Sequence, residues 1–203
     1  MSENPLLQTF ATPVYQRVLP GTEAVNKGLR ELILSRMPAD WQPSRSVMGG
    51  WHSGLDFFNW GGQDVAQLTH WVQQGVGEMS RECLRGTLQG AEVTLFGWAN
   101  VLFDGGFNKV HDHGEYTWSG VYYVDKGDAG DDPNNGILEF IDPRSGVAEA
   151  MKKVVRIQPT AGGLVIFPGW LKHYVLPYRG SDPRISVAFN VKILLKAGAA
   201  ATA

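Results

Sequence analysis

The stretch that decides the fold is NKVHDHGEYTWSGVYYV, residues 108–124. It opens with His111 and His113, one residue apart, and closes in an aromatic, β-branched run that is typical of a buried strand. Side chains alternate along an extended chain, so both imidazoles point to one face and Asp112 points to the other. Two imidazoles on one face can converge on a single metal ion, because imidazole is the commonest metal ligand in proteins.

Short β-rich runs broken by turn residues lie on both sides of this stretch, from residue 92 to residue 193. The expected strands are EVTLFGWANVLF, WSGVYYV, GILEFI, KKVVRI, GLVIF and PRISVAFNVKI. Turn residues separate them, as in Asp104-Gly105-Gly106. Many short strands at this spacing indicate a sandwich or barrel, so we expect a mainly β fold of the jelly-roll type.

Two helices are expected before the β-rich part. Apolar residues recur at helical spacing within residues 22–37, behind Thr22 as a candidate N-cap, and again within residues 62–83. Their apolar faces should pack on the outside of the β core. The run MGGWHSGL, residues 48–55, is expected to form a glycine-rich loop, whose Trp51 and His52 either line a substrate rim or serve packing alone.

Length and charge limit the organisation and the partners. The chain has 203 residues, enough for one domain with a full core, and no linker divides it. We expect a single domain over residues 1–203, with a helical part, residues 1–90, before a double-stranded β core, residues 91–195. A net charge of −2, with 18 basic and 20 acidic residues well mixed, gives no signal for nucleic acid.

Signals for membranes and export are missing from the sequence. No apolar run approaches the roughly 20 residues that span a bilayer, and MSENPLLQTF lacks the pattern of a secretory signal. Cys83 is a single cysteine and cannot form an internal disulfide. These features predict a soluble cytoplasmic protein, whose oligomeric state stays open, with a homodimer as one alternative.

A third metal ligand has to come from another strand, and the chain has five histidines. His70 lies in the second helical pattern, where a surface or core role is expected. His173 differs, because it follows the strand GGLVIF and a Pro-Gly turn and so begins the next strand. A jelly roll brings distant strand ends together, which makes His111, His113 and His173 one candidate metal site.

A polar strand face lies further downstream, in DPRISVAFNV. Arg184, Ser186 and Asn190 share one face of this strand, and its apolar residues share the other. A guanidinium that points inward is costly unless an anion pairs with it, and its planar fork suits a carboxylate. The pattern therefore predicts a bound carboxylate, and the alternative is an internal salt bridge to Glu139 or Asp142.

On these motifs the second half of the chain resembles the double-stranded β-helix of the 2-oxoglutarate- and Fe(II)-dependent oxygenases. The signature of that family is H-x-D/E, then a distal histidine, then R-x-S. The resemblance runs from Trp98 to Lys192, through SGVYYVDKGD, NNGILEFIDPR, GGLVIFPGWLKHYVLP and RISVAFNV. With GGWHS at 49–53 and W-A-N before H-x-H, the whole chain resembles a bacterial and phage subgroup of these oxygenases.

The resemblance implies a role for individual residues. His111 and His173 would ligate Fe(II), and Arg184, assisted by Ser186 and by the hydroxyl of Tyr123, would bind the 5-carboxylate of 2-oxoglutarate. It implies a dioxygenase that uses O₂ to convert 2-oxoglutarate to succinate and CO₂ while it oxidises a C–H bond of an unknown substrate.

One position departs from the family pattern, because His113 stands where the family has Asp or Glu. Three neutral imidazoles would leave the site one unit more positive than two histidines and a carboxylate. Strand alternation favours His113 as the third ligand, with Asp112 and Glu115 as the alternatives.

Two other functions stay open at this point. A cupin-type metalloenzyme without 2-oxoglutarate has a similar histidine pattern, although Glu115 comes too early for the cupin motif and Arg184 is left unexplained. A non-catalytic jelly-roll protein that binds a ligand would hold no stoichiometric metal.

Overall fold

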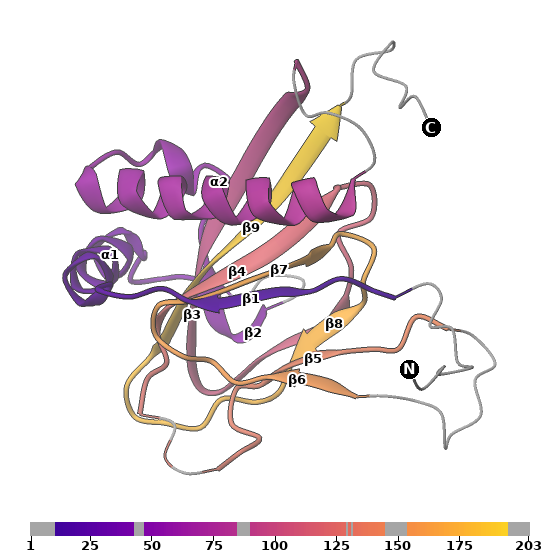
Figure 1. Cartoon of the computed structure of the whole chain (residues 1–203). Helices are drawn as coiled ribbons and strands as arrows, with labels where there is room; N and C mark the ends of the chain where they lie inside the picture. Colours follow the sequence, from indigo (N-terminus) through magenta and orange to yellow (C-terminus); the bar gives the residue numbers. More distant parts are fainter. Residues whose placement is uncertain are drawn as a thin grey trace.

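Within the described residues, nine antiparallel strands form one curled sheet, with two α-helices on its outside (Figure 1). The computed structural model describes residues 11–42, 47–84, 90–128, 130, 132–144 and 154–194. The strands are β1 (Tyr15–Val18), β2 (Val47–His52), β3 (Glu92–His111), β4 (Trp118–Asp125), β5 (Leu138–Phe140), β6 (Val155–Ile157), β7 (Gly163–Pro168), β8 (His173–Val175) and β9 (Arg184–Leu194). The helices are α1 (Glu23–Arg36) and α2 (Gln63–Cys83), and η1 (Phe57–Asn59) is a single 3-10 turn. In this part of the chain, no helix is long and apolar enough to cross a membrane.

The strand order makes the sheet a double-stranded β-helix, the jelly-roll architecture predicted from the strand spacing. The order is β1-β7-β4-β9-β3-β8-β5-β6, and β2 is added to β3. The first part of β3 pairs with β9 and its last part pairs with β8, so β3 belongs to both halves of the sheet. The sheet thereby folds into a larger layer that ends at β1 and a smaller layer that ends at β6 (Figure 1).

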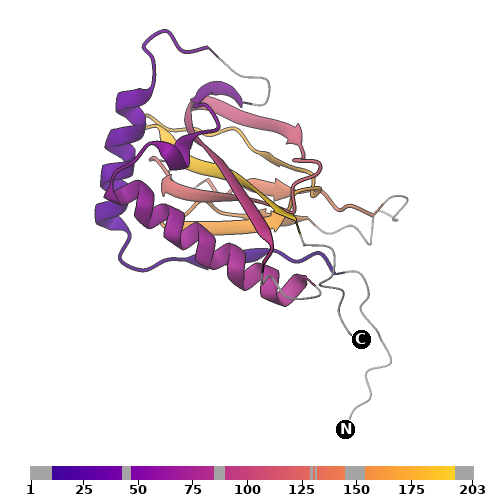
Figure 2. The same ribbon diagram turned by 90° about the horizontal axis from the view of Figure 1, so that it is seen from above.

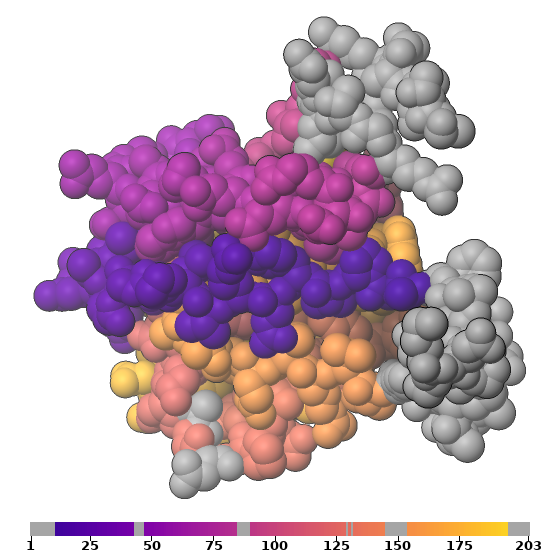
Figure 3. Space-filling view, viewed as in Figure 1, coloured from indigo at the N-terminus to yellow at the C-terminus, as the bar shows by residue number. Residues whose placement is uncertain are grey.

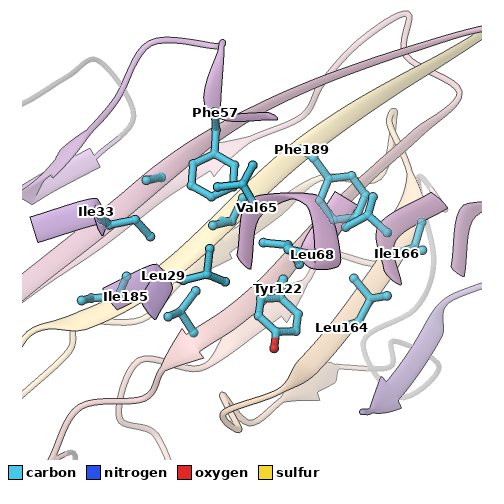
Figure 4. Packing of buried hydrophobic residues seen from close by; sticks show 14 of the residues in the cluster. Leu29, Ile33, Phe57, Val65, Leu68, Tyr122, Leu164, Ile166, Ile185 and Phe189 are labelled. Carbon is cyan, nitrogen blue, oxygen red and sulfur yellow. The ribbon is translucent and has the colours of Figure 1, made fainter. Parts of the chain in front are cut away.

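Both helices pack against the outer face of the larger layer, as Figure 2 shows from above. The apolar faces predicted from the helical period are the buried ones: Leu29 and Ile33 in α1, and Val65, Leu68 and Val72 in α2. In the space-filling view, α2 and the segment of β1 and α1 form adjacent bands over the strands (Figure 3). The sheet residues in contact with these helices include Tyr122, Leu164, Ile166, Ile185 and Phe189 (Figure 4).

Two buried hydrogen bonds join the helices to β4. The indole N–H of Trp118 donates to Ser80 Oγ of α2 at 2.8 Å, and the hydroxyl of Tyr122 donates to Asn26 Oδ1 of α1 at 2.7 Å. Each polar group is buried, so each bond satisfies a donor that water cannot reach. These contacts fix α1 and α2 on β4, whose other face points to the inside of the curled sheet.

Two expectations about the strands were wrong. The glycine-rich run expected as a loop forms β2, which pairs with β3. Asp104-Gly105-Gly106 does not end the preceding strand, because β3 continues through it to His111. A register shift opposite Met48 and Gly50 accommodates the glycines within the ladder. The N-terminal part also contributes β1, at the edge beside β7, which was not expected.

The expected N-cap of α1 is confirmed in position but not in contact. Thr22 stands at the N-cap, yet its side chain makes no capping hydrogen bond. Its Oγ1 instead accepts a hydrogen bond from Asn26 Nδ2 at 3.3 Å. The hydroxyl therefore orients the amide that holds Tyr122, rather than satisfying a free N–H of the helix.

Candidate metal centre and its pocket

The inner face of the larger layer lines a pocket of about 390 Å³. Alternation along β9 creates it, because the apolar residues of this strand pack toward the helices while Arg184 and Ser186 line the pocket. β4 alternates in the same way, with Tyr122 toward the helices and Tyr123 toward the pocket. The polar strand face predicted from the sequence is therefore confirmed.

Three histidines meet at one end of this pocket. His111 ends β3, His113 follows two residues later, and His173 begins β8 directly opposite His111 in the β3–β8 ladder. The ring centroids lie 4.4 Å (His111–His173), 5.1 Å (His111–His113) and 5.2 Å (His113–His173) apart. One ring nitrogen of each lies within 4.8 Å of the others, so the structure brings together the three histidines proposed from the sequence.

Backbone carbonyls orient two of the three rings. Nδ1 of His111 lies 2.7 Å from the carbonyl oxygen of Lys109, and Nδ1 of His173 lies 2.8 Å from that of Leu171. An N–H at Nδ1 donates to each carbonyl, which leaves the lone pair of Nε2 free for a metal ion. Because each carbonyl belongs to the residue two positions earlier, the local backbone sets both tautomers.

Burial keeps two of the imidazoles neutral. Burial, reinforced by the neighbouring His111, lowers the pKa of His113 to about 4 and that of His173 to about 3. A metal ligand needs an unprotonated nitrogen. At neutral pH neither ring therefore carries an extra proton that would have to leave before an ion binds.

The two neighbouring carboxylates turn to other partners. Asp112 is exposed, and its Oδ1 accepts a hydrogen bond from the backbone N–H of Gly114 at 3.1 Å. Glu115 is also exposed and pairs with Lys192 at 3.0 Å. Neither converges with the three histidines, so the geometry favours His113 over both carboxylates.

Arg184 is buried without an anion. Only 2% of it is exposed, its Nε has no hydrogen-bond partner, and it forms no ion pair within the described ranges. The internal salt bridge considered as the alternative is not formed, because Glu139 pairs with Arg156 at 2.9 Å and Asp142 pairs with Arg144 at 2.5 Å. An unpaired buried cation is costly, which indicates that a bound anion completes this end of the pocket.

Tyr123 and Ser186 lie beside the guanidinium. They face each other in the β4–β9 ladder, and Cζ of Arg184 lies 5.2 Å from the ring centroid of Tyr123. The Tyr123 hydroxyl is buried and has no hydrogen-bond partner among the residues that the structure describes. Burial raises the pKa of Tyr123, so the hydroxyl keeps its proton and can donate. These unsatisfied donors next to one cation suit a carboxylate.

The lining of the pocket also includes residues that the sequence did not assign to a site. Leu55 and Trp98 line it, and the Trp98 ring centroid lies 5.9 Å from that of His113. His52 also lines it and pairs with Asn100 across β2 and β3, whereas Trp51 is buried in the core. Alternation on β3 could have predicted that Trp98 and Asn100 share a face, but not which face points inward.

Comparison with known proteins connects this geometry to a reaction. Residues 97–190 match the family model described as "Putative 2OG-Fe(II) oxygenase". The fold is similar to that of a prolyl-4-hydroxylase from Pseudomonas putida, at 18% identity over 89% of this chain and 92% of that one, with a TM-score of 0.67.

Two further structures share the fold. One is a Trichoplax adhaerens prolyl hydroxylase in complex with a hypoxia-inducible-factor peptide, at 13% identity over 88% of this chain and 83% of that one, TM-score 0.59. The other is the epimerase SnoN in complex with Fe³⁺ and α-ketoglutarate, at 12% identity over 89% and 79%, TM-score 0.61. No curated protein matches the sequence.

The side chains of the pocket fit the two groups that this family uses. Imidazole nitrogens are suitable ligands for iron, and the three histidines offer one each. The buried, unpaired Arg184 and Tyr123 suit the far carboxylate of 2-oxoglutarate. Over residues 97–190 the chain is therefore similar to the 2OG-Fe(II) oxygenases, and its pocket fits an oxidoreductase that uses Fe(II) and 2-oxoglutarate.

Proposed function

We propose that this protein is a dioxygenase whose iron is held by His111, His113 and His173 and whose 2-oxoglutarate is held by Arg184, with Ser186 and Tyr123 assisting. One observation carries the assignment: a buried guanidinium with no ion-pair partner among the described residues shares a pocket with three convergent imidazoles. Neither feature stabilises the fold in the absence of a ligand, because unpaired buried polar groups cost free energy.

Three neutral imidazoles distinguish this centre from one with two histidines and a carboxylate. They add no negative charge, so the iron site attracts an anionic co-substrate more strongly and holds a higher reduction potential. Arg184 supplies a second positive charge six residues along β9 from Asn190, at the opposite end of the pocket. The dianion of 2-oxoglutarate is thus bound between two positive groups.

The primary substrate binds, in our proposal, beside the lining residues His52, Leu55 and Trp98. When bound, the iron with 2-oxoglutarate and O₂ supplies oxidative decarboxylation to succinate and CO₂, coupled to oxidation of a substrate C–H bond. Trp98 lies beside His113 and so would orient the substrate against the metal.

We also propose a cytoplasmic location and a homodimer. Size-exclusion chromatography with light scattering tests the homodimer.

Anaerobic titration with Fe(II) and then 2-oxoglutarate tests the assignment. Chelation of iron by a 2-oxo acid gives a visible charge-transfer band, which we expect for the native protein. His173→Ala should lose the band, whereas His70→Ala should keep it, because His70 is exposed on α2 away from the pocket. In air, the native protein should release succinate.

The outcomes separate the alternatives. Metal binding without the band would favour a cupin-type enzyme that does not use 2-oxoglutarate. Absence of stoichiometric metal would favour a non-catalytic binding protein. Equal background succinate from the native protein and His173→Ala would rule out the oxygenase.

A further inference from the structure

Asn190 lies at the histidine end of the pocket-facing side of β9. The residue is buried, with 7% exposed, and its Nδ2 lies 3.3 Å from Nδ1 of His113. Its Oδ1 is buried and has no hydrogen-bond partner in the described part of the chain. A buried amide that is only half satisfied is unusual, and it touches the one residue that departs from the family pattern.

The contact has a consequence for the proton on His113. An N–H of Asn190 can be accepted only by an unprotonated Nδ1, which places the proton of the neutral ring on Nε2. A ring protonated at Nε2 cannot bind a metal through that nitrogen. His111 and His173 have no such conflict, because backbone carbonyls accept from their Nδ1.

We propose that Asn190 is a positioning residue that controls which nitrogen of His113 is free for metal. This inference rests on the proposed three-histidine centre. When a metal binds Nε2 of His113, the ring proton is on Nδ1 and requires an acceptor, and Oδ1 is the only acceptor in the Asn190 side chain. A half-turn of the amide exchanges Nδ2 for Oδ1 and gives the unpaired oxygen a donor.

The same geometry predicts that this half-turn of the Asn190 amide costs free energy. The half-turn moves Nδ2 into the buried position that Oδ1 occupies. Asn190→Asp avoids this, because a carboxylate has an oxygen at both positions and accepts from Nδ1 without rotating. We therefore expect Asn190→Asp to bind metal at least as tightly as the native protein at pH 7, although it is a charged residue in a buried place.

Nitrogen NMR of ¹⁵N-histidine-labelled protein tests the tautomer directly, with Zn(II) as the probe. In the metal-free protein, His113 should carry its proton on Nε2, while His111 and His173 carry theirs on Nδ1. After one equivalent of Zn(II), all three should be protonated on Nδ1. Zn(II) bound with His113 protonated on Nε2 would overturn the inference and leave the metal centre standing. Absence of a Zn(II) effect on all three rings would instead overturn the proposed centre.

Competition titrations for Zn(II) test the contribution of Asn190 to affinity. Asn190→Leu should weaken binding by about tenfold or more, the usual loss when a hydrogen-bond partner of a ligand histidine is removed. Asn190→Asp should restore native affinity. Asn26→Leu is the matched control, since Asn26 is equally buried but binds Tyr122 in the helix layer. Native affinity in Asn190→Leu, or equal losses in the leucine and aspartate variants, would overturn the inference.

Discussion

At the scale of single residues, Arg184 provides the sharpest test of the co-substrate site. Arg184→Leu removes the buried cation and leaves a shorter, apolar side chain in its place. Each hydrogen bond to a charged group contributes about 1.5–3 kcal/mol, so 2-oxoglutarate affinity should fall at least about tenfold while Zn(II) affinity changes little. Calorimetric titration of the Zn(II)-loaded protein with 2-oxoglutarate measures the loss.

A second arginine serves as the control for this substitution. Arg156 pairs with Glu139 between β5 and β6, and its side chain is half exposed. Arg156→Leu should leave 2-oxoglutarate affinity at the native value. If Arg184→Leu lowers Zn(II) and 2-oxoglutarate affinity by the same factor, Arg184 is structural and its assignment fails.

The direction of individual side chains was predictable where the local chain decides it. Alternation was enough to prefer His113 over Asp112, because it requires only that residues 111–113 be extended. The contact between His113 and Asn190 could not be predicted in this way. It joins the end of β3 to β9, and a contact between strands depends on a register that the sequence pattern does not specify.

At the scale of elements, the turn that leads into β9 depends on one carboxylate. Asp128 accepts hydrogen bonds from Tyr178 Oη and from the backbone N–H groups of Ser181 and Asp182, at 3.0, 3.1 and 3.0 Å. The Ser181 hydroxyl also donates to it. These bonds, above all the one from the Ser181 hydroxyl, hold the pKa of Asp128 well below its usual value. The carboxylate thus fixes the segment that positions Arg184.

The sign of the pH dependence follows from this lowered pKa. A group with a lowered folded-state pKa stabilises the fold above its unfolded pKa, about 3.9 for Asp, and loses that contribution as the pH falls further. Asp128→Asn should therefore unfold at lower urea concentration than the native protein at pH 7. The gap should begin to shrink below about pH 4. An equal gap at pH 7 and pH 3 would show that the effect is steric and not electrostatic.

The link between α2 and β4 makes a second prediction for the elements. Ser80→Ala leaves the buried indole N–H of Trp118 without its acceptor, which should lower the free energy of unfolding by about 1–3 kcal/mol. Urea denaturation of the metal-free protein measures the change. Ser35→Ala in α1 is the control, because the Ser35 hydroxyl is exposed and donates only to the Leu32 carbonyl. Equal effects of the two substitutions would contradict a specific role for Ser80.

Elements with a strong period were predicted well, and glycine-rich ones were not. Both helices and most strands follow from spacing alone, because one apolar face must be buried. Glycines at positions 49–50 and 105–106 have the sequence pattern of a loop and a turn. In the structure they lie within or beside the β2–β3 ladder, where a Cβ on Gly50 or Gly106 would meet a backbone oxygen at 2.5 or 2.6 Å. Glycine at these positions allows the two strands to approach closely. In sequence, such glycines look the same as those of a turn.

At the scale of the whole molecule, one core joins the N-terminal helices to the β-helix. Buried residues of α1 and α2 pack in the same cluster as those of β3, β4, β7 and β9. We therefore expect a single unfolding transition, with coincident far-ultraviolet dichroism and tryptophan fluorescence. Loss of helical signal before the fluorescence change would show that residues 1–90 fold separately.

Zn(II) at 100 times its dissociation constant should stabilise the protein by about 2.7 kcal/mol.

The long strand β3 has a property that matters for how such a chain can change over generations. Between Asn108 and His111 it advances three residues while β8 advances only two, from Val175 to His173. This one extra residue changes which side chains face the pocket, so His111 lies on the same side as Asn108 although their numbers differ by an odd count. Deletion of a single codon between them would return the strand to regular alternation, with His111 two positions after Asn108 and therefore still on the pocket side. A lineage could thus gain or lose this one residue and still keep the metal ligand His111 on the pocket side of the strand.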